Sequence, residues 1–227
     1  MKPPYSIAVL NQKGGVGKSM VSQNLAAAAH LAGHRTLLVD LDAQGTSWDW
    51  FAQRSASSPL RGLVVQKVDR LLTQALYADL TKGFEVVVFD GPPALGKVTQ
   101  AAAVAADVVL IPLRAGPAEW WAAATTVETL DHADAIREQL GLPPARRLWM
   151  LNESDGRVKE AQFIEQALRD AKLELLPVRW ASRVAYNRAR GIGEATVSAE
   201  PDGAAAREVR ALYDAIFALR EQLKGAA

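Results

Sequence analysis

Short apolar runs alternate with longer amphipathic stretches along the whole chain. The runs are rich in β-branched residues and are continuously hydrophobic, whereas a strand with one solvated face would alternate between apolar and polar positions. Continuous hydrophobicity is typical of strands that are buried on both faces of a parallel sheet. We therefore expect strands at residues 6–10, 36–39, 63–68, 85–89, 108–112 and 148–151.

The stretches between these runs are rich in alanine, and they predict helices at residues 18–32, 69–81, 95–106, 118–140, 158–172 and 204–224. The alternation of strands and helices predicts an α/β fold, with a doubly wound, mostly parallel sheet flanked by helices. We find no internal repeat and no linker, so we expect a single domain over residues 1–227. The last helix has an apolar face, for which docking onto the domain is favoured over a role at a membrane surface.

Composition restricts the chemistry that this chain can carry. The net charge of +1 gives no bulk attraction to nucleic acid or to an anionic membrane, so any basic surface must be local. The chain has no cysteine, which excludes disulfides, thiolate zinc sites and iron–sulfur clusters. No apolar stretch is long enough for a membrane span or a secretion signal. We therefore expect a cytoplasmic protein.

A glycine-rich turn lies between the first predicted strand and the first predicted helix, and it reads Lys13-Gly14-Gly15-Val16-Gly17-Lys18-Ser19. This context is typical of a phosphate-binding loop, in which backbone N–H groups face inward and the helix start adds a positive dipole end. Lys18 would supply charge to the β- and γ-phosphates, and Ser19 would offer its hydroxyl to Mg²⁺. Gln12 stands where the common pattern has its first glycine, so the loop is a variant.

This segment resembles the deviant Walker A motif of the ParA/MinD family of ATPases. The resemblance implies that Lys13 is the family's signature lysine, which reaches across a dimer interface to the partner's nucleotide, while Lys18 serves its own ATP. Met20 stands where the family usually has threonine. The implied nucleotide-binding residues of this segment are Gly14, Gly15, Val16, Gly17, Lys18, Ser19 and Met20.

Two further segments extend the resemblance. The segment TLLVDLDAQGTSWDW resembles the family's first switch, which implies that Asp40 helps to hold the magnesium shell and that Asp42 orients the attacking water. Ala43 replaces the proline that is usual in this switch, which should loosen the loop. Lys13, Lys18 and Asp42 are then the implied catalytic residues.

The segment FEVVVFDGPPALG resembles the family's Walker B strand and second switch. The resemblance implies that Asp90 sits beside Mg²⁺ together with Ser19 and Asp40, and that Gly91 and Pro92 contact the nucleotide. Asp40 and Asp90 both end predicted strands, which places them at the carboxyl edge of a parallel sheet, where ligands of such folds bind. ATP and Mg²⁺ are therefore the expected cofactors.

A basic segment from residue 175 to residue 193 contains no acid. A ParA-like protein would use such a cluster to contact DNA phosphates without sequence preference. The other interpretation is a solvated basic face with one or two packed aromatic residues, and the sequence leaves both open. The arginines concerned are Arg179, Arg183, Arg188 and Arg190.

The end of the chain resembles that of small ParA proteins of the ParF type. The resemblance implies a homodimer formed with ATP, non-specific binding to nucleoid DNA, and a small ParB-like or adaptor protein that stimulates an otherwise weak ATPase. We expect no N-terminal DNA-reading domain and no stable membrane association. The alternative is a MinD-like regulator recruited to the membrane. The cargo could be a plasmid, a chromosome, a compartment or a protein cluster.

Overall fold

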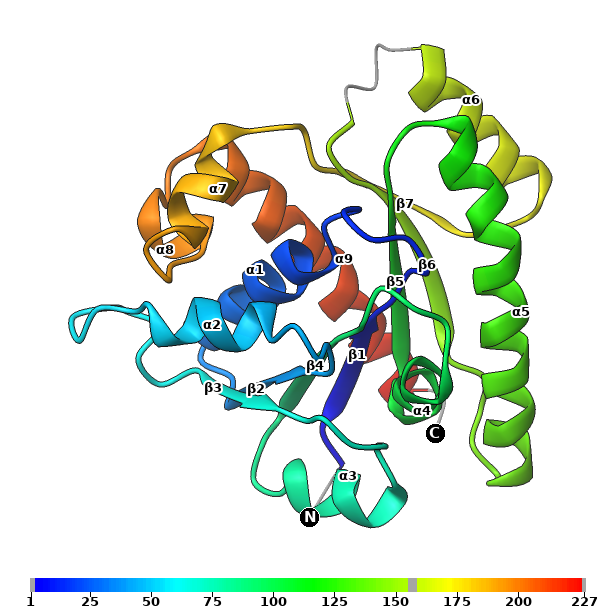
Figure 1. The fold of residues 1–227 in the computed structure, drawn as a ribbon, viewed down its shortest axis with the longest axis horizontal. Coiled ribbons are helices and arrows are strands. Elements are labelled where there is room, and N and C mark those ends of the chain that lie inside the picture. The colour runs from blue at the N-terminus through cyan, green and yellow to red at the C-terminus, as the bar shows by residue number, and fades with distance from the viewer. Residues whose placement is uncertain (1–2, 155–158, 226–227) are drawn as a thin grey trace.

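The computed structural model describes residues 3–154 and 159–225, and its centre is one parallel sheet (Figure 1). Seven strands lie in the order β3-β2-β4-β1-β5-β6-β7, and every neighbouring pair is parallel. The fold class predicted from the sequence is therefore confirmed. The strands are β1 (Tyr5–Val9), β2 (Thr36–Asp40), β3 (Val64–Lys67), β4 (Val86–Asp90), β5 (Val108–Leu113), β6 (Arg146–Leu151) and β7 (Leu175–Arg179).

Helices cover both faces of this sheet (Figure 1). One face packs against α1 (Lys18–Leu31), α2 (Thr46–Ala52), α7 (Val184–Arg190), α8 (Thr196–Ala199) and α9 (Ala204–Gly225). The other face packs against α3 (Gln74–Leu80), α4 (Lys97–Ala105), α5 (Pro117–Gln139) and α6 (Lys159–Asp170).

Strand β4 shows why the apolar runs are continuous. Val86 and Val88 belong to the core on the side of α1 and α9, whereas Val87 and Phe89 belong to the core on the side of α4 and α5. Successive side chains of a strand point to opposite faces, and here both faces are buried, so every position is apolar. Within the described ranges, no helix is long and apolar enough to cross a membrane.

Strand β7 was not predicted from the sequence, which treated residues 175–193 only as a basic segment. The strand lies at the edge of the sheet, contains Pro177, and pairs with β6 through an irregular register. An edge strand tolerates proline because one side of its backbone needs no ladder bond. Its half-exposed pattern lacks the continuous hydrophobicity that revealed the other strands.

The helix predicted from residue 69 was wrong at its start. Helix α3 begins at Gln74, because Thr73 lies outside the helix and its hydroxyl accepts a hydrogen bond from the N–H of Leu76 at 3.2 Å. The short helices α2, α7 and α8 were not predicted, because helices of this length show little periodicity. The predicted start of the sixth helix at residue 158 falls outside the described residues.

Candidate nucleotide-binding site

The glycine-rich loop connects the end of β1 to the start of α1, as predicted. Gly15 and Gly17 have φ angles of 77° and 90°, a left-handed conformation that favours glycine. A Cβ atom at Gly17 would also collide with the side-chain amide of Asn152. That amide donates a hydrogen bond from Nδ2 to the carbonyl oxygen of Val16 at 2.7 Å. The shape of the loop therefore depends on glycine at residue 17.

Two buried asparagines hold the loop, and the sequence analysis missed both. Asn11 donates from Nδ2 to the carbonyl oxygen of Pro112 at 2.8 Å and accepts from the backbone N–H of Lys13 at 2.9 Å. Asn152 follows β6 and reaches the loop from the other side. The only sequence signal was that each asparagine comes directly after a buried strand, at the carboxyl edge of the sheet.

The side chain of Lys18 is buried and lies over this loop. It is 6% exposed, and its Nζ donates a hydrogen bond to the carbonyl oxygen of Lys13 at 2.9 Å. Burial lowers the pKa of Lys18, while the nearby carboxylates of Asp90 and Asp42 act in the opposite direction. A cation in this position suits an anionic ligand held by the loop.

Asp40 ends β2 and holds the start of the next helix. Its Oδ2 accepts hydrogen bonds from the N–H groups of Ser47 and Trp48 at 2.8 and 2.9 Å, and its Oδ1 accepts from the N–H of Asp42 at 3.0 Å. A carboxylate is favourable at a helix N-terminus, because the free N–H groups there carry partial positive charge. Asp40 thereby ties α2 to the edge of the sheet.

Asp90 ends β4 and lies beside Asp40, with which it is paired in the register of the two strands. Its Oδ2 accepts a hydrogen bond from the Ser47 hydroxyl at 2.6 Å, and its Oδ1 accepts from the Ser22 hydroxyl at 3.3 Å. Burial raises the pKa of Asp90 to about 7, and the charge of Asp40 adds to the rise, whereas hydrogen bonds from Ser47, Ser19 and Ser22 oppose it. Burial also raises the pKa of Asp40.

The two acids fit a hydrated divalent cation. Both are fully buried, and across the described part of the chain neither forms an ion pair. Among the described residues, no group of three or more His, Cys, Asp or Glu side chains is placed so that it could hold a metal ion. Mg²⁺ matches such a sparse oxygen set, because it keeps several waters and binds one or two carboxylates together with substrate phosphates. The Ser19 hydroxyl, which forms a hydrogen bond with Asp90, is a further oxygen that could hold such an ion.

The two segments predicted as switches lie at the same edge of the sheet. Asp42 is partly buried, and its Oδ1 accepts a hydrogen bond from the N–H of Gln44 at 3.0 Å. Lys67 donates from Nζ to the carbonyl oxygen of Ala43 at 2.8 Å, a link from β3 that the sequence analysis missed. A Cβ atom at Gly91 would lie 2.5 Å from a methyl carbon of Leu10 and 2.9 Å from the carbonyl oxygen of Val9, so the backbone passes there only as glycine.

The remaining residues that the sequence predicts to contact the nucleotide differ in how far they are exposed to solvent. The side chain of Met20 is 9% exposed and packs in the core, so only its backbone is available to a ligand. The first turn of a helix leaves N–H groups without intrahelical acceptors, and Met20 lies in the first turn of α1. Pro92 is partly buried, and Gly14 and Gly15 are exposed.

The arginines of the basic segment lie apart from the glycine-rich loop, on β7, on α7 and before α7. Arg179 forms an ion pair with Glu165 at 2.7 Å. Arg183 pairs with Glu208 at 2.6 Å, and Arg188 pairs with Glu200 at 2.9 Å. The segment has no acid of its own, but acids from α6, from α9 and from the end of α8 approach it in space.

Arg190 differs from these arginines. It is exposed on α7, and among the ion pairs of the described residues it has none. The aromatic residues Trp180 and Tyr186 are 0% and 2% exposed and stack on each other with ring centroids 5.0 Å apart. They therefore belong to the core and do not form an exposed stacking platform.

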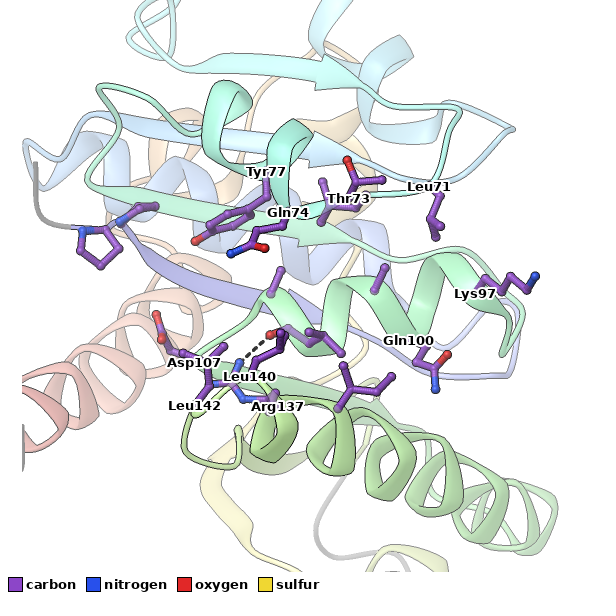
Figure 2. Close-up of a pocket in the computed structure, with 17 residues that line it drawn as sticks. Leu71, Thr73, Gln74, Tyr77, Lys97, Gln100, Asp107, Arg137, Leu140 and Leu142 are labelled. Carbon is purple, nitrogen blue, oxygen red and sulfur yellow. Dashed lines mark hydrogen bonds between the residues drawn. The ribbon is translucent and has the colours of Figure 1, made fainter.

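A cavity of about 600 Å³ lies between α3, α4 and the end of α5 (Figure 2). Its walls are mainly apolar, and at one end Arg137 donates hydrogen bonds to the carbonyl oxygens of Val104 and Ala106 at 2.7 and 2.6 Å. The glycine-rich loop and the two buried acids do not line it. Lys97, the first residue of α4, lines the cavity and follows the second switch segment in the chain.

The fold and the glycine-rich loop define the P-loop class of nucleotide-binding proteins. The model of the CobQ/CobB/MinD/ParA nucleotide binding domain matches residues 7–192, and the chain belongs to this family. The resemblance seen in the sequence is thereby confirmed.

Relatives within this family are named for the partitioning of chromosomes or the distribution of carboxysomes. The chain is 33% identical over 192 residues to the chromosome-partitioning ATPase Soj of Thermus thermophilus, covering 72% of this chain and 75% of Soj. It is 40% identical over 131 residues to the maintenance of carboxysome distribution protein A of Gloeobacter kilaueensis, covering 57% of each protein.

Solved structures share the fold at lower sequence identity. The MinD cell division protein of Aquifex aeolicus superimposes with a TM-score of 0.71 at 16% identity, covering 95% of this chain and 97% of that one. A Cyanothece McdA variant in complex with ATP superimposes with a TM-score of 0.70 at 16% identity, with the same coverage. At this identity the comparison concerns the fold alone.

Proposed function

We propose that this protein is an ATPase that dimerises with ATP and positions DNA or another large cargo in the cell. The observation that carries the proposal is the pair of buried acids, Asp40 and Asp90, beside a glycine-rich loop that holds both Lys13 and Lys18. The partitioning and positioning names of the relatives support the cellular role.

The residues of the loop have separate tasks in this proposal. Backbone N–H groups from Gly14 to Met20 surround the phosphates, and Lys18 neutralises charge on the β- and γ-phosphates. Asp40, Asp90 and Ser19 hold the hydrated magnesium. When bound, the ion neutralises phosphate charge and orients the phosphates for in-line attack.

Lys13 explains why the loop contains a second lysine. Lys18 is buried and already provides the cation that one phosphate chain needs from its own subunit. Lys13 is at the start of the same loop and is only partly buried, and we assign it to the nucleotide of a second subunit. A cation supplied across an interface stabilises charge in the transition state, as an arginine finger does, and it makes dimerisation depend on ATP.

Asp42 is the residue that we assign to the attacking water. It lies in the loop between β2 and α2, where it is only partly buried. A group on such a loop reaches its catalytic position only when the loop closes, so hydrolysis should be slow until a partner or DNA stabilises the closed arrangement. Gly91 and Pro92 begin the second loop at this edge and would respond to the γ-phosphate.

We propose that the ATP-bound dimer binds DNA, and that the contacts to DNA phosphates come from Arg179, Arg183, Arg188 and Arg190. One monomer presents little charge, and two copies acting together raise the affinity through effective concentration. The protein would then be a cytoplasmic, nucleoid-associated homodimer, released by a small ParB-like or adaptor protein that stimulates hydrolysis. Plasmid partition is one such role.

The experiment that tests this function measures binding to two surfaces. The protein is incubated with magnesium and ATP, ADP or no nucleotide, and its binding to random-sequence duplex DNA and to anionic liposomes is measured at low salt. We expect binding to DNA only with ATP. Binding to liposomes only with ATP would favour the MinD-like alternative, and the absence of any nucleotide effect on both surfaces would contradict the proposal.

A further inference from the structure

Ser47 is the point at which three parts of the candidate site meet. It is the second residue of α2, and its side chain is fully buried. Its backbone N–H donates to Oδ2 of Asp40 at 2.8 Å, and its hydroxyl donates to Oδ2 of Asp90 at 2.6 Å. One residue thereby contacts the carboxylates that end β2 and β4.

The direction of the Ser47 hydroxyl is determined by its neighbours. The Nε2 group of Gln23, on α1, lies 3.1 Å from the Ser47 oxygen and can only donate. The hydroxyl therefore accepts from Gln23 and has its single hydrogen free for Asp90, which as a carboxylate can only accept. Gln23 is itself 2% exposed, so this chain of bonds is sealed from solvent.

These bonds also restrict the orientation of Asp90. Ser47 holds Oδ2 from the side of α2 at 2.6 Å. Ser22, on α1, lies 3.3 Å from Oδ1, but its single hydroxyl hydrogen has a closer acceptor in the carbonyl oxygen of Lys18 at 2.9 Å, so the Ser47 bond is the stronger of the two. A carboxylate that accepts a bond of 2.6 Å from a buried hydroxyl cannot rotate freely about its last torsion angle. Groups that orient the residues around a metal site typically affect metal affinity strongly even though they do not touch the metal.

We propose that Ser47 is a positioning residue of the magnesium site, which sets the orientation of Asp90 and couples it to the start of α2. This inference rests on the proposed function, because it assigns Ser47 a role toward the magnesium that accompanies the nucleotide. Nothing in the motif resemblance pointed to Ser47, since its role arises only when β4, α1 and α2 pack together.

The test compares the Ser47→Ala variant with the wild-type protein. Calorimetric titration with a non-hydrolysable ATP analogue gives the dissociation constant with magnesium and again with EDTA. The ratio of the dissociation constant in EDTA to that with magnesium measures how much magnesium strengthens binding. We expect this ratio to fall by about tenfold in Ser47→Ala, because Asp90 loses the bond that orients it. The constant in EDTA should stay close to that of the wild type, since the loop and Lys18 are unchanged. Both constants are measured on the same variant, so a lower fraction of folded protein would affect both constants alike and would not change their ratio.

The matched control is Ser198→Ala. Ser198 also donates from its hydroxyl to a carboxylate oxygen, that of Glu194 at 2.5 Å, but it lies on α8 away from the acids. This control should keep the wild-type ratio. Gln23→Ala removes the bond that orients the Ser47 hydroxyl while leaving the hydroxyl in place, and it should lower the ratio by a smaller factor.

The outcomes of this experiment distinguish the role of Ser47 from the proposed function on which it rests. A wild-type protein that binds the analogue better with magnesium, together with an unchanged ratio in Ser47→Ala, overturns the positioning role and leaves the proposed function intact. A wild-type protein that does not bind the analogue overturns both. A lowered ratio in Ser198→Ala as large as that in Ser47→Ala also overturns the positioning role, because the effect would then be a general response to losing a hydroxyl.

Discussion

The ammonium group of Lys18 donates a hydrogen bond to the carbonyl oxygen of Lys13 at 2.9 Å. The two lysines of the glycine-rich loop therefore meet through one backbone group, although their side chains differ in burial. A bound phosphate chain would compete for the same ammonium, and the carbonyl of Lys13 would then lose this donor. Nucleotide binding is in this way linked to the backbone that carries Lys13.

Replacement of the two lysines should separate nucleotide binding from dimerisation. Lys18→Ala should abolish tight ATP binding, because the phosphates lose their main charge partner within the subunit. Lys13→Ala should keep measurable ATP binding and lose the ATP-dependent dimer. Calorimetry measures the first property and light scattering the second. An ATP-dependent dimer of Lys13→Ala would show that Lys13 has no role across the interface.

Asp42→Ala should accumulate an ATP-bound dimer. The phosphate-binding residues remain, but the carboxylate that we assign to the attacking water is gone, so hydrolysis should fall by a factor of about 100 or more. Phosphate release measures turnover, and light scattering with ATP measures the dimer. Normal turnover in this variant would remove Asp42 from the mechanism.

The stability of the nucleotide-free protein should depend on pH through Asp90. Its pKa is about 7 in the folded protein and 3.8 as an ordinary side chain, so ionisation is disfavoured by folding. The stabilising contribution is complete below the ordinary pKa and is lost as the pH rises through about 7. Relative to Asp90→Asn, the wild-type protein should therefore lose about 3 kcal/mol of unfolding free energy between about pH 5 and about pH 8.

Urea denaturation of both proteins without magnesium measures this difference. Titrating groups that do not interact with Asp90 contribute equally in both proteins and cancel in the comparison, whereas Asp40, whose charge acts on Asp90, titrates together with it. Magnesium with nucleotide should reduce the pH dependence, because a bound cation favours the ionised carboxylate. Parallel pH profiles for the two proteins would contradict the assigned pKa.

The exposed arginines of α7 should affect DNA binding more than the arginine that precedes this helix. Arg183 is held by Glu208, which also accepts a hydrogen bond from Tyr186 at 2.8 Å, so Arg183→Ala should lower stability in addition to removing a smaller part of the DNA affinity. Arg188 and Arg190 are exposed. The double variant Arg188→Ala, Arg190→Ala should keep the ATP-dependent dimer and weaken all DNA sequences alike, with a salt slope lower by about one unit per lost phosphate contact.

Fluorescence anisotropy on random-sequence duplex at several salt concentrations measures that slope. Arg146→Ala is a suitable control, because Arg146 is also an exposed arginine with an acidic partner, Glu174, but lies on β6 outside the basic segment. An unchanged slope in the double variant would place the DNA surface elsewhere on the protein.

Local pattern was sufficient for most of the fold. The strands that are buried on both faces were visible as continuous apolar runs, and only β7, an edge strand with Pro177, was missed. Helix α2 was also missed, although it is central to the site. Its start is stabilised by the carboxylate of Asp40 at the end of the preceding strand, and the periodicity of the sequence does not record this bond.

The sequence by itself determined the glycine-rich loop, its two lysines and the acids at the strand ends, because these lie within short segments and each segment carries its own chemistry. Only the tertiary structure decided which residues support them. Asn152 reaches Val16, Gln23 donates to Ser47, which in turn donates to Asp90, and acids from other elements pair with arginines of the basic segment. These partners lie far apart in the chain, and neither propensity nor periodicity records a hydrogen bond that forms between different elements when they pack.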